Sequence, residues 1–286
     1  MSSEVETSLD ISSPGSSQRF LDFVRNDKSK EATGCLFTAL STYYDDDEHS
    51  AAMNMAIDEA LLDSVAIPSI RFYRWRSPAL SFGYFGKFTD VADYVGERDL
   101  VRRWTGGGIV FHGEDLTYSI VVPPSDPVFS ESSRSTYAAI HAALRNALAA
   151  NGERVELAPV AGVVDAGTAK LAKATGVSEP SYNADRGYGC FANPVRADVM
   201  LNGRKIAGAA QRRTRRGLLQ QGTIQLAIGR VRPTGGDVDL GNGLAQRFTE
   251  ELSNNCKTRN LPVTVRYRAQ EIVAQKYGTE DWLRKR

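Results

Sequence analysis

The dipeptide Asn202-Gly203 constrains the fold of this chain more than any other local feature, because it separates two runs in which apolar and polar residues alternate. Asn-Gly in that place is the strongest short-range signal for a two-residue hairpin turn, in which both turn residues adopt positive φ. Pairing Leu201 with Arg204 then sets Val199 opposite Ile206 and fixes the register of both strands. An antiparallel hairpin is therefore predicted around Asn202-Gly203.

The predicted register assigns each hairpin residue to one of two faces, because successive side chains of a strand point to opposite sides. The apolar face, which we expect in the core, carries Val199, Leu201, Ile206 and Gly208. The other face carries Asp198, Met200, Lys205, Ala207, Ala209 and Gln211. Asp198 and Lys205 then stand diagonally, about 7 to 8 Å apart at the backbone. This face is predicted to line a pocket; the alternative is a solvated sheet face on which both charges only add solubility.

Composition and charge are those of an ordinary globular protein. The 286 residues are 42% hydrophobic and 24% charged, and Lys plus Arg number 35 against 34 for Asp plus Glu. This balance gives no net field that would attract nucleic acid or an anionic membrane, so we expect neither as a partner. The cysteines, Cys35, Cys190 and Cys256, form no CxxC and no disulfide framework, and the histidines lack zinc-ligand spacing. We therefore predict reduced thiols and no structural metal.

The organisation along the chain predicts one folded domain after a loose tail. Residues 1–33 are rich in Ser, Asp and Lys with little apolar periodicity, so they are predicted to be disordered. Residues 34–286 contain no internal repeat and no long linker, and we expect a single domain without a separate accessory domain. The acidic N-terminus lacks the basic and apolar runs of a signal peptide, and no run approaches about 18 apolar residues. A cytoplasmic protein is predicted.

Strand-like and helical patterns follow one another in the way that predicts an α+β fold, a mixed sheet with flanking helices. Ser50 is expected to cap a helix over residues 51–65, and a second helix is predicted over residues 133–150. Strands are predicted at "CLFTAL", "SIRFYRW" and "ALSFGYF", with an acidic turn at "YYDDDEHS". The runs "LVRRW" and "IVFH" are expected to pair through "TGGG", and residues 159–189 are predicted to be loop.

Three consecutive glycines, Gly106–Gly108, follow the arginine pair Arg102-Arg103. Glycines let the backbone approach a ligand closely and can turn several N–H groups towards one anion. Because neighbouring strand residues point to opposite faces, only one of the two arginines can face that ligand. The loop has neither P-loop nor GxGxxG spacing, which disfavours both nucleotide-binding classes. A flexible turn without a ligand is the alternative.

Four segments, in order, resemble the biotin and lipoate protein ligase family: "NMAIDEALL", "LVRRWTGGGIVFHGEDLTYS", "GCFANPVRADVMLNGRKIAGAAQRR" and "LLQQGTIQL". From about Leu36 onwards the chain is similar to the catalytic domains of lipoate-protein ligases and cysteine-dependent octanoyltransferases. The resemblance implies an α+β fold like that of class II aminoacyl-tRNA synthetases and biotin synthetases. It implies that Lys205 lies in a buried tunnel and contacts the acyl carbonyl or carboxylate. The substrate-binding positions that it implies are Arg103, Thr105, Gly106, Gly107, Gly108, His112, Asp198, Ala207, Gly208 and Ala209.

The family contains two chemistries that modify a lysine of a lipoyl carrier domain, as in a 2-oxoacid dehydrogenase E2 or a glycine cleavage H protein-like acceptor. Transferases take octanoate from acyl carrier protein through a cysteine thioester without a cofactor, whereas ligases use ATP and Mg²⁺ to form lipoyl-AMP. Cys190 lies fifteen positions before Lys205, as the transferase nucleophile does. Two departures weaken this match: Gly108, where transferases usually have arginine, and "NPVRAD", whose "RAD" is closer to the ligases. The transferase is preferred, with Cys190 and Lys205 as catalytic residues.

Simpler interpretations stay open for several of these features. A free cysteine such as Cys190 is usually a small buried hydrophobe, and His112 is expected to be a hydrogen-bonded strand residue rather than a general base. The basic run Arg212–Arg216 is either a solvated hairpin loop or a docking site for an acidic carrier domain. For the whole chain, a third alternative is a protein that binds lipoate or octanoate without catalysis.

Overall fold

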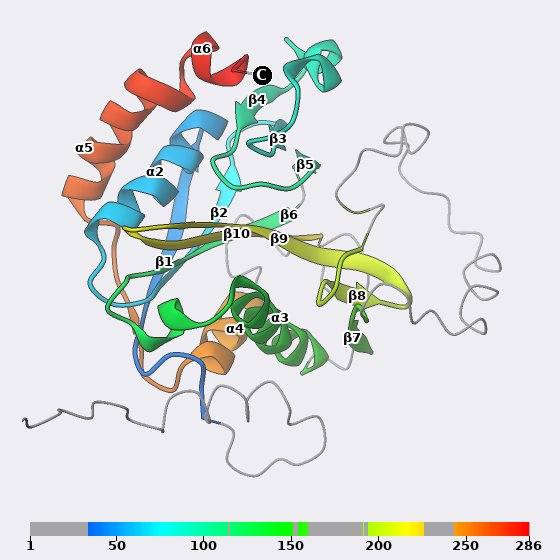
Figure 1. Ribbon diagram of the computed structural model, residues 1–286, viewed down its shortest axis with the longest axis vertical. Coiled ribbons are helices and arrows are strands. Elements are labelled where there is room, and N and C mark those ends of the chain that lie inside the picture. Colours follow the sequence, from blue (N-terminus) through cyan, green and yellow to red (C-terminus); the bar gives the residue numbers. More distant parts are fainter. Residues whose placement is uncertain are drawn as a thin grey trace, which may run out of the picture.

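The computed structural model describes residues 34–113, 115–150, 154–159, 191, 194–225 and 243–285. In this part of the chain, a mixed sheet of eight strands forms the centre of the molecule (Figure 1). Its spatial order is β11 (Cys256–Thr258), β1 (Leu40–His49), β2 (Ser69–Trp75), β6 (Asp115–Val122), β10 (Gly217–Gln225), β9 (Arg204–Thr214), β8 (Val199–Leu201) and β7 (Val155–Leu157). Strand β1 runs parallel to β11 and β2, and the other neighbouring strands are antiparallel.

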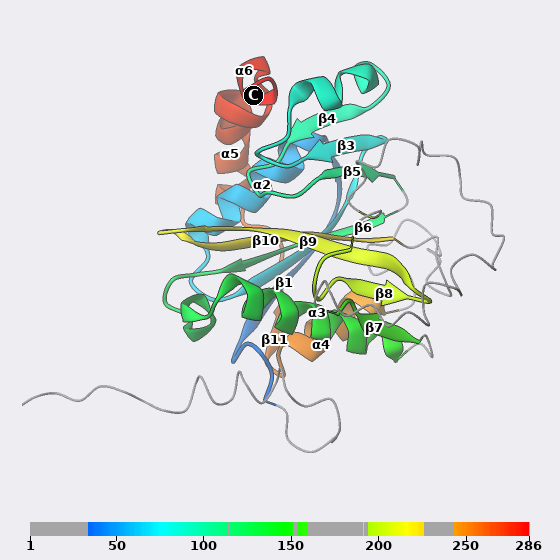
Figure 2. The ribbon, with the colours of Figure 1, turned by 45° about the vertical axis from the view of Figure 1, so that its right-hand side comes forward.

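A smaller sheet lies above one face of the main sheet (Figure 2). It consists of β4 (Asp99–Arg102), β3 (Ala79–Phe82) and β5 (Ile109–His112). The predicted pairing of β4 with β5 is wrong, because β3 lies between them and pairs with both. The glycine loop must therefore cross the end of β3, where a Cβ on Gly83 would lie 2.1 Å from the Gly107 carbonyl oxygen. Only glycine at position 83 permits this crossing.

Helices cover both faces of the main sheet (Figures 1 and 2). On the side of the small sheet lie α2 (Ala51–Ser64), α5 (Val263–Ile272) and α6 (Glu280–Leu283), and on the opposite side lie α3 (Ser133–Ala149) and α4 (Leu244–Leu252). Short helical turns occupy Phe88–Asp90, Ala92–Tyr94 and Pro127–Ser130, and a π-helical turn, Val273–Tyr277, continues α5. The predicted α+β fold, a mixed sheet with flanking helices, is confirmed.

The two helices predicted from their caps are confirmed. The Ser50 hydroxyl accepts a hydrogen bond from the Met53 N–H at 3.3 Å, which satisfies one of the free donors at the start of α2. Ser132 does the same for α3 through the Ser135 N–H at 3.1 Å. Both helices end one residue before the predicted boundary.

Strand β1 differs from the prediction, because it starts at Leu40 and contains the acidic residues that were expected in a turn. Asp45 is buried within it and accepts a hydrogen bond from Arg71 Nε on β2 at 2.7 Å. Arg71 is fully buried and also pairs with Asp58 of α2 at 2.9 Å. The buried Arg71 offsets the cost of burying the Asp45 carboxylate. Because Arg71 is distant from Asp45 in the sequence, the local composition of this segment does not reveal that it forms a strand.

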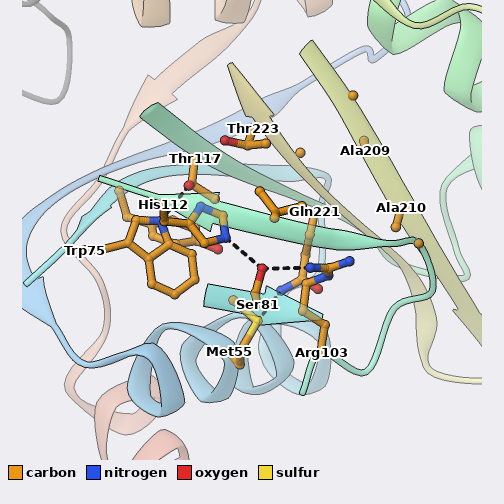
Figure 3. A pocket seen from close by; sticks show the side chains of 15 residues that line it. Met55, Trp75, Ser81, Arg103, His112, Thr117, Ala209, Ala210, Gln221 and Thr223 are labelled. Atoms are coloured by element: carbon orange, nitrogen blue, oxygen red, sulfur yellow. Dashed lines mark hydrogen bonds between the residues drawn. The ribbon is translucent and has the colours of Figure 1, made fainter. Parts of the chain in front are cut away.

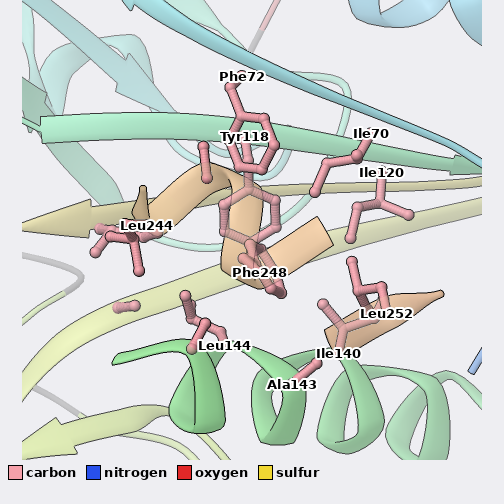
Figure 4. Close-up of a cluster of buried hydrophobic side chains, with 14 of the residues drawn as sticks. Ile70, Phe72, Tyr118, Ile120, Ile140, Ala143, Leu144, Leu244, Phe248 and Leu252 are labelled. Carbon is pink, nitrogen blue, oxygen red and sulfur yellow. The ribbon is translucent and has the colours of Figure 1, made fainter. Parts of the chain in front are cut away.

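An apolar core fills the space between the main sheet and α3 and α4 (Figure 4). Tyr118 of β6 and Phe248 of α4 meet edge to face with ring centroids 5.2 Å apart, and Ile140 and Leu144 of α3 belong to the same cluster. A second core lies on the other face, where α2 and α5 pack over the sheet. The pocket described below lies on this second side.

The hairpin is confirmed, but its register is predicted only near the turn. Asn202 and Gly203 have φ of 51° and 77°, and Met200 pairs with Lys205 as expected. Val199, however, pairs with Ala207 instead of Ile206, because a bulge inserts one residue after Lys205. The extra residue exchanges the two faces beyond it. Ile206 and Ala207 therefore both belong to the core, and Gly208 lies on the side of Lys205. The predictions that Ala207 faces the pocket and Gly208 the core are wrong.

Several predictions fall outside the described residues and remain predictions: the tail at 1–33, most of the loop at 159–189, and Cys190. Within the described ranges, no helix combines the length and apolar character that crossing a bilayer requires.

Candidate functional site

A pocket lies between the small sheet and the main sheet, on the side of α2 (Figure 3). It encloses about 430 Å³, including the space at its open mouth. Part of its wall is apolar, from Met55, Tyr73, Trp75, Val110, Ala209 and Ala210. The apolar part of this lining is compatible with an acyl chain.

Lys205 lies beside this pocket in an ion pair with Asp198. Its Nζ is 2.8 Å from Asp198 Oδ2, and both side chains are buried. The aliphatic stem of Lys205 crosses Gly208, which lines the pocket: a Cβ on Gly208 would lie 2.5 Å from Lys205 Cε and 2.8 Å from Nζ. The predicted acid and base are thus brought into direct contact, and the glycine opposite Thr223 makes room for the ammonium.

Tyr137 of α3 holds Asp198 in place, and sequence reasoning missed this role. Its hydroxyl donates to Asp198 Oδ1 at 2.6 Å and accepts from the Ala209 N–H at 3.1 Å. The Val195 N–H also donates to Asp198, at 2.6 Å. Burial and the neighbouring carboxylate raise the pKa of the Tyr137 phenol, so the hydroxyl stays a donor. A tyrosine among the aliphatic residues of a helix stripe was the only signal in the sequence.

The glycine loop is shaped by Arg103. Its Nη2 donates to the carbonyl oxygens of Gly106 at 3.0 Å and Gly108 at 2.8 Å, and its Nη1 donates to Ser81 Oγ at 2.7 Å. Gly107 has φ of 89° and lines the pocket, and a Cβ there would lie 3.2 Å from Arg103 Nη2. The loop therefore approaches the pocket with its backbone, and its contact with a ligand stays a prediction.

The neighbours of Arg103 and Gly106–Gly108 connect the loop to the rest of the fold. Arg102 points away from the pocket, as alternation predicts, and donates to the carbonyls of Trp282 and Leu283 near the C-terminus. Thr105 Oγ1 donates to Gln221 Oε1 on β10 at 2.8 Å. Thr105 thus ties the loop to the main sheet and is itself fully buried.

His112 lies in the pocket wall within a hydrogen-bonded chain. Its Nε2 is 2.7 Å from Ser81 Oγ, and its Nδ1 is 2.7 Å from Asp115 Oδ2 (Figure 3 shows Ser81 between His112 and Arg103). Burial alone would raise the pKa of the Asp115 carboxyl, but His112 and hydrogen bonds from Thr223 and the Gly113 N–H outweigh it and lower that pKa to about 2. Asp115 is therefore a carboxylate at neutral pH.

Cys190 lies outside the described residues. The next residue, Phe191, has its ring centroid 5.7 Å from Lys205 Nζ. A cation beside the face of an aromatic ring at this distance is a favourable contact.

Among the described residues, one group brings three possible metal ligands within 4.8 Å of one another: Asp45, Asp47 and His49 on β1. Asp45 already binds Arg71 and His49. None of the three residues lines the pocket.

The model of the lipoyl protein ligase A/B catalytic domain family matches residues 50–229. An octanoyltransferase LipM of Oceanobacillus iheyensis is 37% identical over 62% of this chain and 61% of that protein. A LipM of Brevibacillus brevis is 33% identical over 67% of this chain and 64% of its own length, and that of Halalkalibacterium halodurans is 32% identical over 77% of each. The matched region thus spans less than two thirds of the first two relatives.

Solved structures of lipoate ligases share the fold. A lipoate-protein ligase A bound with ATP superposes on 86% of this chain and 98% of its own with a TM-score of 0.61 at 23% identity. The bipartite lipoate protein ligase of Thermoplasma acidophilum covers 86% of this chain and 96% of its own with a TM-score of 0.56 at 21% identity. The class of α+β fold expected from the sequence is confirmed by this likeness.

Proposed function

This chain belongs to the lipoyl protein ligase A/B catalytic domain family, and we propose that it transfers an octanoyl group to a lysine of a lipoyl carrier domain through a thioester on Cys190. The observation that carries the proposal is the buried ammonium of Lys205, which crosses Gly208 at the pocket. The octanoyltransferase relatives support octanoate as the acyl group. A lipoyl group, which is an octanoyl chain that carries two sulfur atoms, is the alternative acyl group that the enzyme would transfer.

Lys205 is proposed to orient the acyl carbonyl and to stabilise the charge that develops on its oxygen. The ammonium donates to Asp198 and, with three N–H bonds, can also donate to the acyl oxygen. In a site without bulk water, a donor aimed at such an oxyanion lowers the barrier by about 3–4 kcal/mol. The apolar lining of the pocket would hold the acyl tail, and the glycine loop would border it.

Cys190 is proposed as the nucleophile. A free cysteine with a pKa near 8.5 is largely protonated at neutral pH, and a neighbouring cation favours the reactive thiolate. The contact of Phe191 with Lys205 supports pairing Cys190 with that cation, since the two residues are adjacent in the sequence.

The donor is proposed to be an acyl carrier protein, and the acceptor a lipoyl domain of the 2-oxoacid dehydrogenase E2 or glycine cleavage H protein-like kind. No cofactor is then required, because the donor thioester is already activated. The ATP-dependent alternative fits less well. Mg²⁺ is usually held by one or two carboxylates besides phosphate. In the part of the chain that the structure describes, Asp115 and Asp198 lie beside the pocket and already bind His112 and Lys205.

Intact-mass analysis of a lipoyl domain tests the proposal. The domain is incubated with this protein and octanoyl carrier protein, and in parallel with this protein, lipoate and MgATP. We expect an octanoyl increment on the domain in the first reaction. An increment only in the second would instead favour a ligase that acts through lipoyl-AMP. If an acyl ligand binds to this protein but neither reaction adds mass to the lipoyl domain, the protein would be a non-catalytic binding protein.

A further inference from the structure

Acyl transfer to lysine needs a group that accepts a proton. The side chain of a free lysine has a pKa of about 10.4, so at neutral pH it arrives as an ammonium without a lone pair for attack. Lys205 is poorly suited to take that proton, because its own ammonium donates to the Asp198 carboxylate at 2.8 Å. Arg103, a cation of the pocket wall, is permanently protonated and cannot accept one.

His112 is the imidazole of the pocket wall, and its tautomer follows from its neighbours. Nδ1 faces the Asp115 carboxylate and therefore carries the hydrogen, which leaves the lone pair of neutral His112 on Nε2. Ser81 Oγ must accept from Arg103, which has only donors, so the Ser81 hydrogen is directed to His112 Nε2. The chain Ser81–His112–Asp115 is thus oriented to move a proton from the pocket towards the carboxylate.

The surroundings fix this chain in position. Trp75 stacks on the His112 ring with centroids 4.0 Å apart and an interplanar angle of 22°. The indole N–H of Trp75 donates to Thr117 Oγ1 at 2.8 Å, and Thr117 in turn donates to Asp115 Oδ2 at 3.0 Å. A carboxylate that orients a histidine and stabilises its protonated form is the arrangement found in serine hydrolases.

The chain also lies close to the Lys205 ammonium, which is proposed to bind the reacting carbonyl. Gly208, Thr223 and Thr117 are paired side by side across β9, β10 and β6. The Lys205 ammonium lies over Gly208 at one end of this row, and both threonine hydroxyls bind Asp115 at the other. Two strand spacings separate the ends, about 10 Å, which an acyl carbonyl and an attacking amine can span.

We propose that Ser81, His112 and Asp115 form a proton relay that deprotonates the acceptor lysine, an inference that rests on the proposed acyl transfer. Ser81 gives its hydrogen to His112 Nε2 as it takes a proton from the acceptor ammonium. The freed amine attacks the thioester carbon and forms the C–N bond, while the C–S bond breaks and its electron pair stays on the cysteine sulfur. His112 passes this first proton to the cysteine thiolate, which restores the thiol. It then takes the second nitrogen proton by the same route and releases it to water.

If the relay is correct, its loss should affect transfer of the acyl group but not formation of the acyl-enzyme, and transfer to lysine but not transfer to hydroxylamine. Formation of the acyl-enzyme exchanges one thiolate for another and needs no base, so it should survive loss of the relay. Hydroxylamine is already unprotonated at pH 7, so its attack should survive as well. Transfer to lysine should fall about 100-fold or more, the usual contribution of a general base.

The experiment compares wild type with His112→Asn and with Ser81→Ala, the milder change if the first variant fails to fold. Octanoyl carrier protein loads each enzyme, and stopped-flow mixing with either a lipoyl domain or hydroxylamine measures discharge. Ser69→Ala, a buried serine of β2 whose hydroxyl donates to the Ile67 carbonyl, is the matched control. We expect both relay variants to load and to discharge to hydroxylamine within about threefold of wild type, while discharge to the lipoyl domain is lost.

Equal losses towards both acceptors, or undiminished transfer to the lipoyl domain, would overturn the relay. An octanoyl group found on Ser81 would overturn it too, because Ser81 would then be a nucleophile. If wild type acquired no octanoyl mass, the proposed function would be wrong and the relay with it.

Discussion

At the scale of single residues, Gly208 is as important to the proposed site as Lys205. Gly208→Ala would place a methyl group 2.5 Å from Lys205 Cε, so the ammonium must move away from the pocket. We expect acyl transfer to fall at least tenfold, because a misplaced donor loses its contact with the developing charge. Gly34→Ala, where a Cβ meets nothing within 4 Å, is the control. Comparable activity of the two variants would contradict the assigned place of the ammonium.

Removal of the ammonium itself should have the larger effect. Lys205→Ala is expected to lower kcat by about 100- to 1,000-fold, the scale of a lost oxyanion donor. Arg204→Ala changes the adjacent, exposed cation of the hairpin and should be mild. Steady-state kinetics with octanoyl carrier protein measures both. If the two variants were equally active, Lys205 would not contact the acyl group.

The residues of the site differ in how far the sequence reveals them. Lys205 and Asp198 flank one hairpin, so their proximity follows from strand pairing alone. Tyr137, Ser81 and Asp115 come from α3, β3 and β6, and only the tertiary fold brings them to the pocket. Asp115 had a local signal, since it lies three residues after His112, but a carboxylate in a loop-like "HGED" is too common to identify a partner.

At the scale of elements, the local sequence determines that the hairpin forms, but it does not determine the register of the two strands. Asn202-Gly203 specifies the turn, and residues next to it pair as alternation requires. The bulge after Lys205 is favoured by packing, because it buries both Ile206 and Ala207 and leaves Gly208 beneath the ammonium. For the same reason, the position of β3 between β4 and β5 is not predicted from the sequence, because it depends on contacts between distant segments.

His141 of helix α3 should make the stability of the fold depend on pH in the acidic range. Burial lowers the pKa of His141 from 6.5 to about 4, although its contact with the Ala197 carbonyl opposes the shift. The folded state disfavours the proton, so stability is complete above pH 6.5 and falls as the pH drops from 6.5 to about 4. The loss should reach about 3 kcal/mol.

Urea unfolding across that pH range measures the effect of His141. His141→Gln keeps a donor and an acceptor for the Ala197 carbonyl and the Tyr118 hydroxyl but does not titrate. The variant should show a shallower loss of unfolding free energy than wild type. Identical pH slopes would mean that His141 is not the group responsible.

At the scale of the whole molecule, a cationic surface lies outside the glycine loop. Arg212, Arg216 and Lys276 surround the Trp104 ring, with centroid distances of 5.1, 5.1 and 4.4 Å. Arg213 donates to backbone carbonyls of Phe129 and Glu131, and Arg216 pairs with Asp63. The basic run is therefore partly structural, and docking of an acidic carrier stays a prediction for Arg212 and Arg215.

Charge reversal tests that docking. Arg212→Glu with Arg215→Glu should slow association with an acidic carrier by about tenfold at low salt, and the difference from wild type should shrink as salt is added. Arg145→Glu on α3, on the other side of the main sheet, is a control for net charge. Association kinetics of wild type that do not respond to salt would contradict a docking role.

The central claim is that Cys190 carries the acyl group, and the mass of the protein after mixing with octanoyl carrier protein tests it most directly. Burial raises the pKa of both Cys35 and Cys256, which makes them poorer nucleophiles and suitable controls. We predict one octanoyl increment on the peptide that contains Cys190, removable by hydroxylamine, retained in Cys256→Ala, and absent from a Cys190→Ala protein that no longer modifies the lipoyl domain. A Cys190→Ala protein that stays fully active, requires ATP and releases AMP with each acyl group attached would contradict the claim.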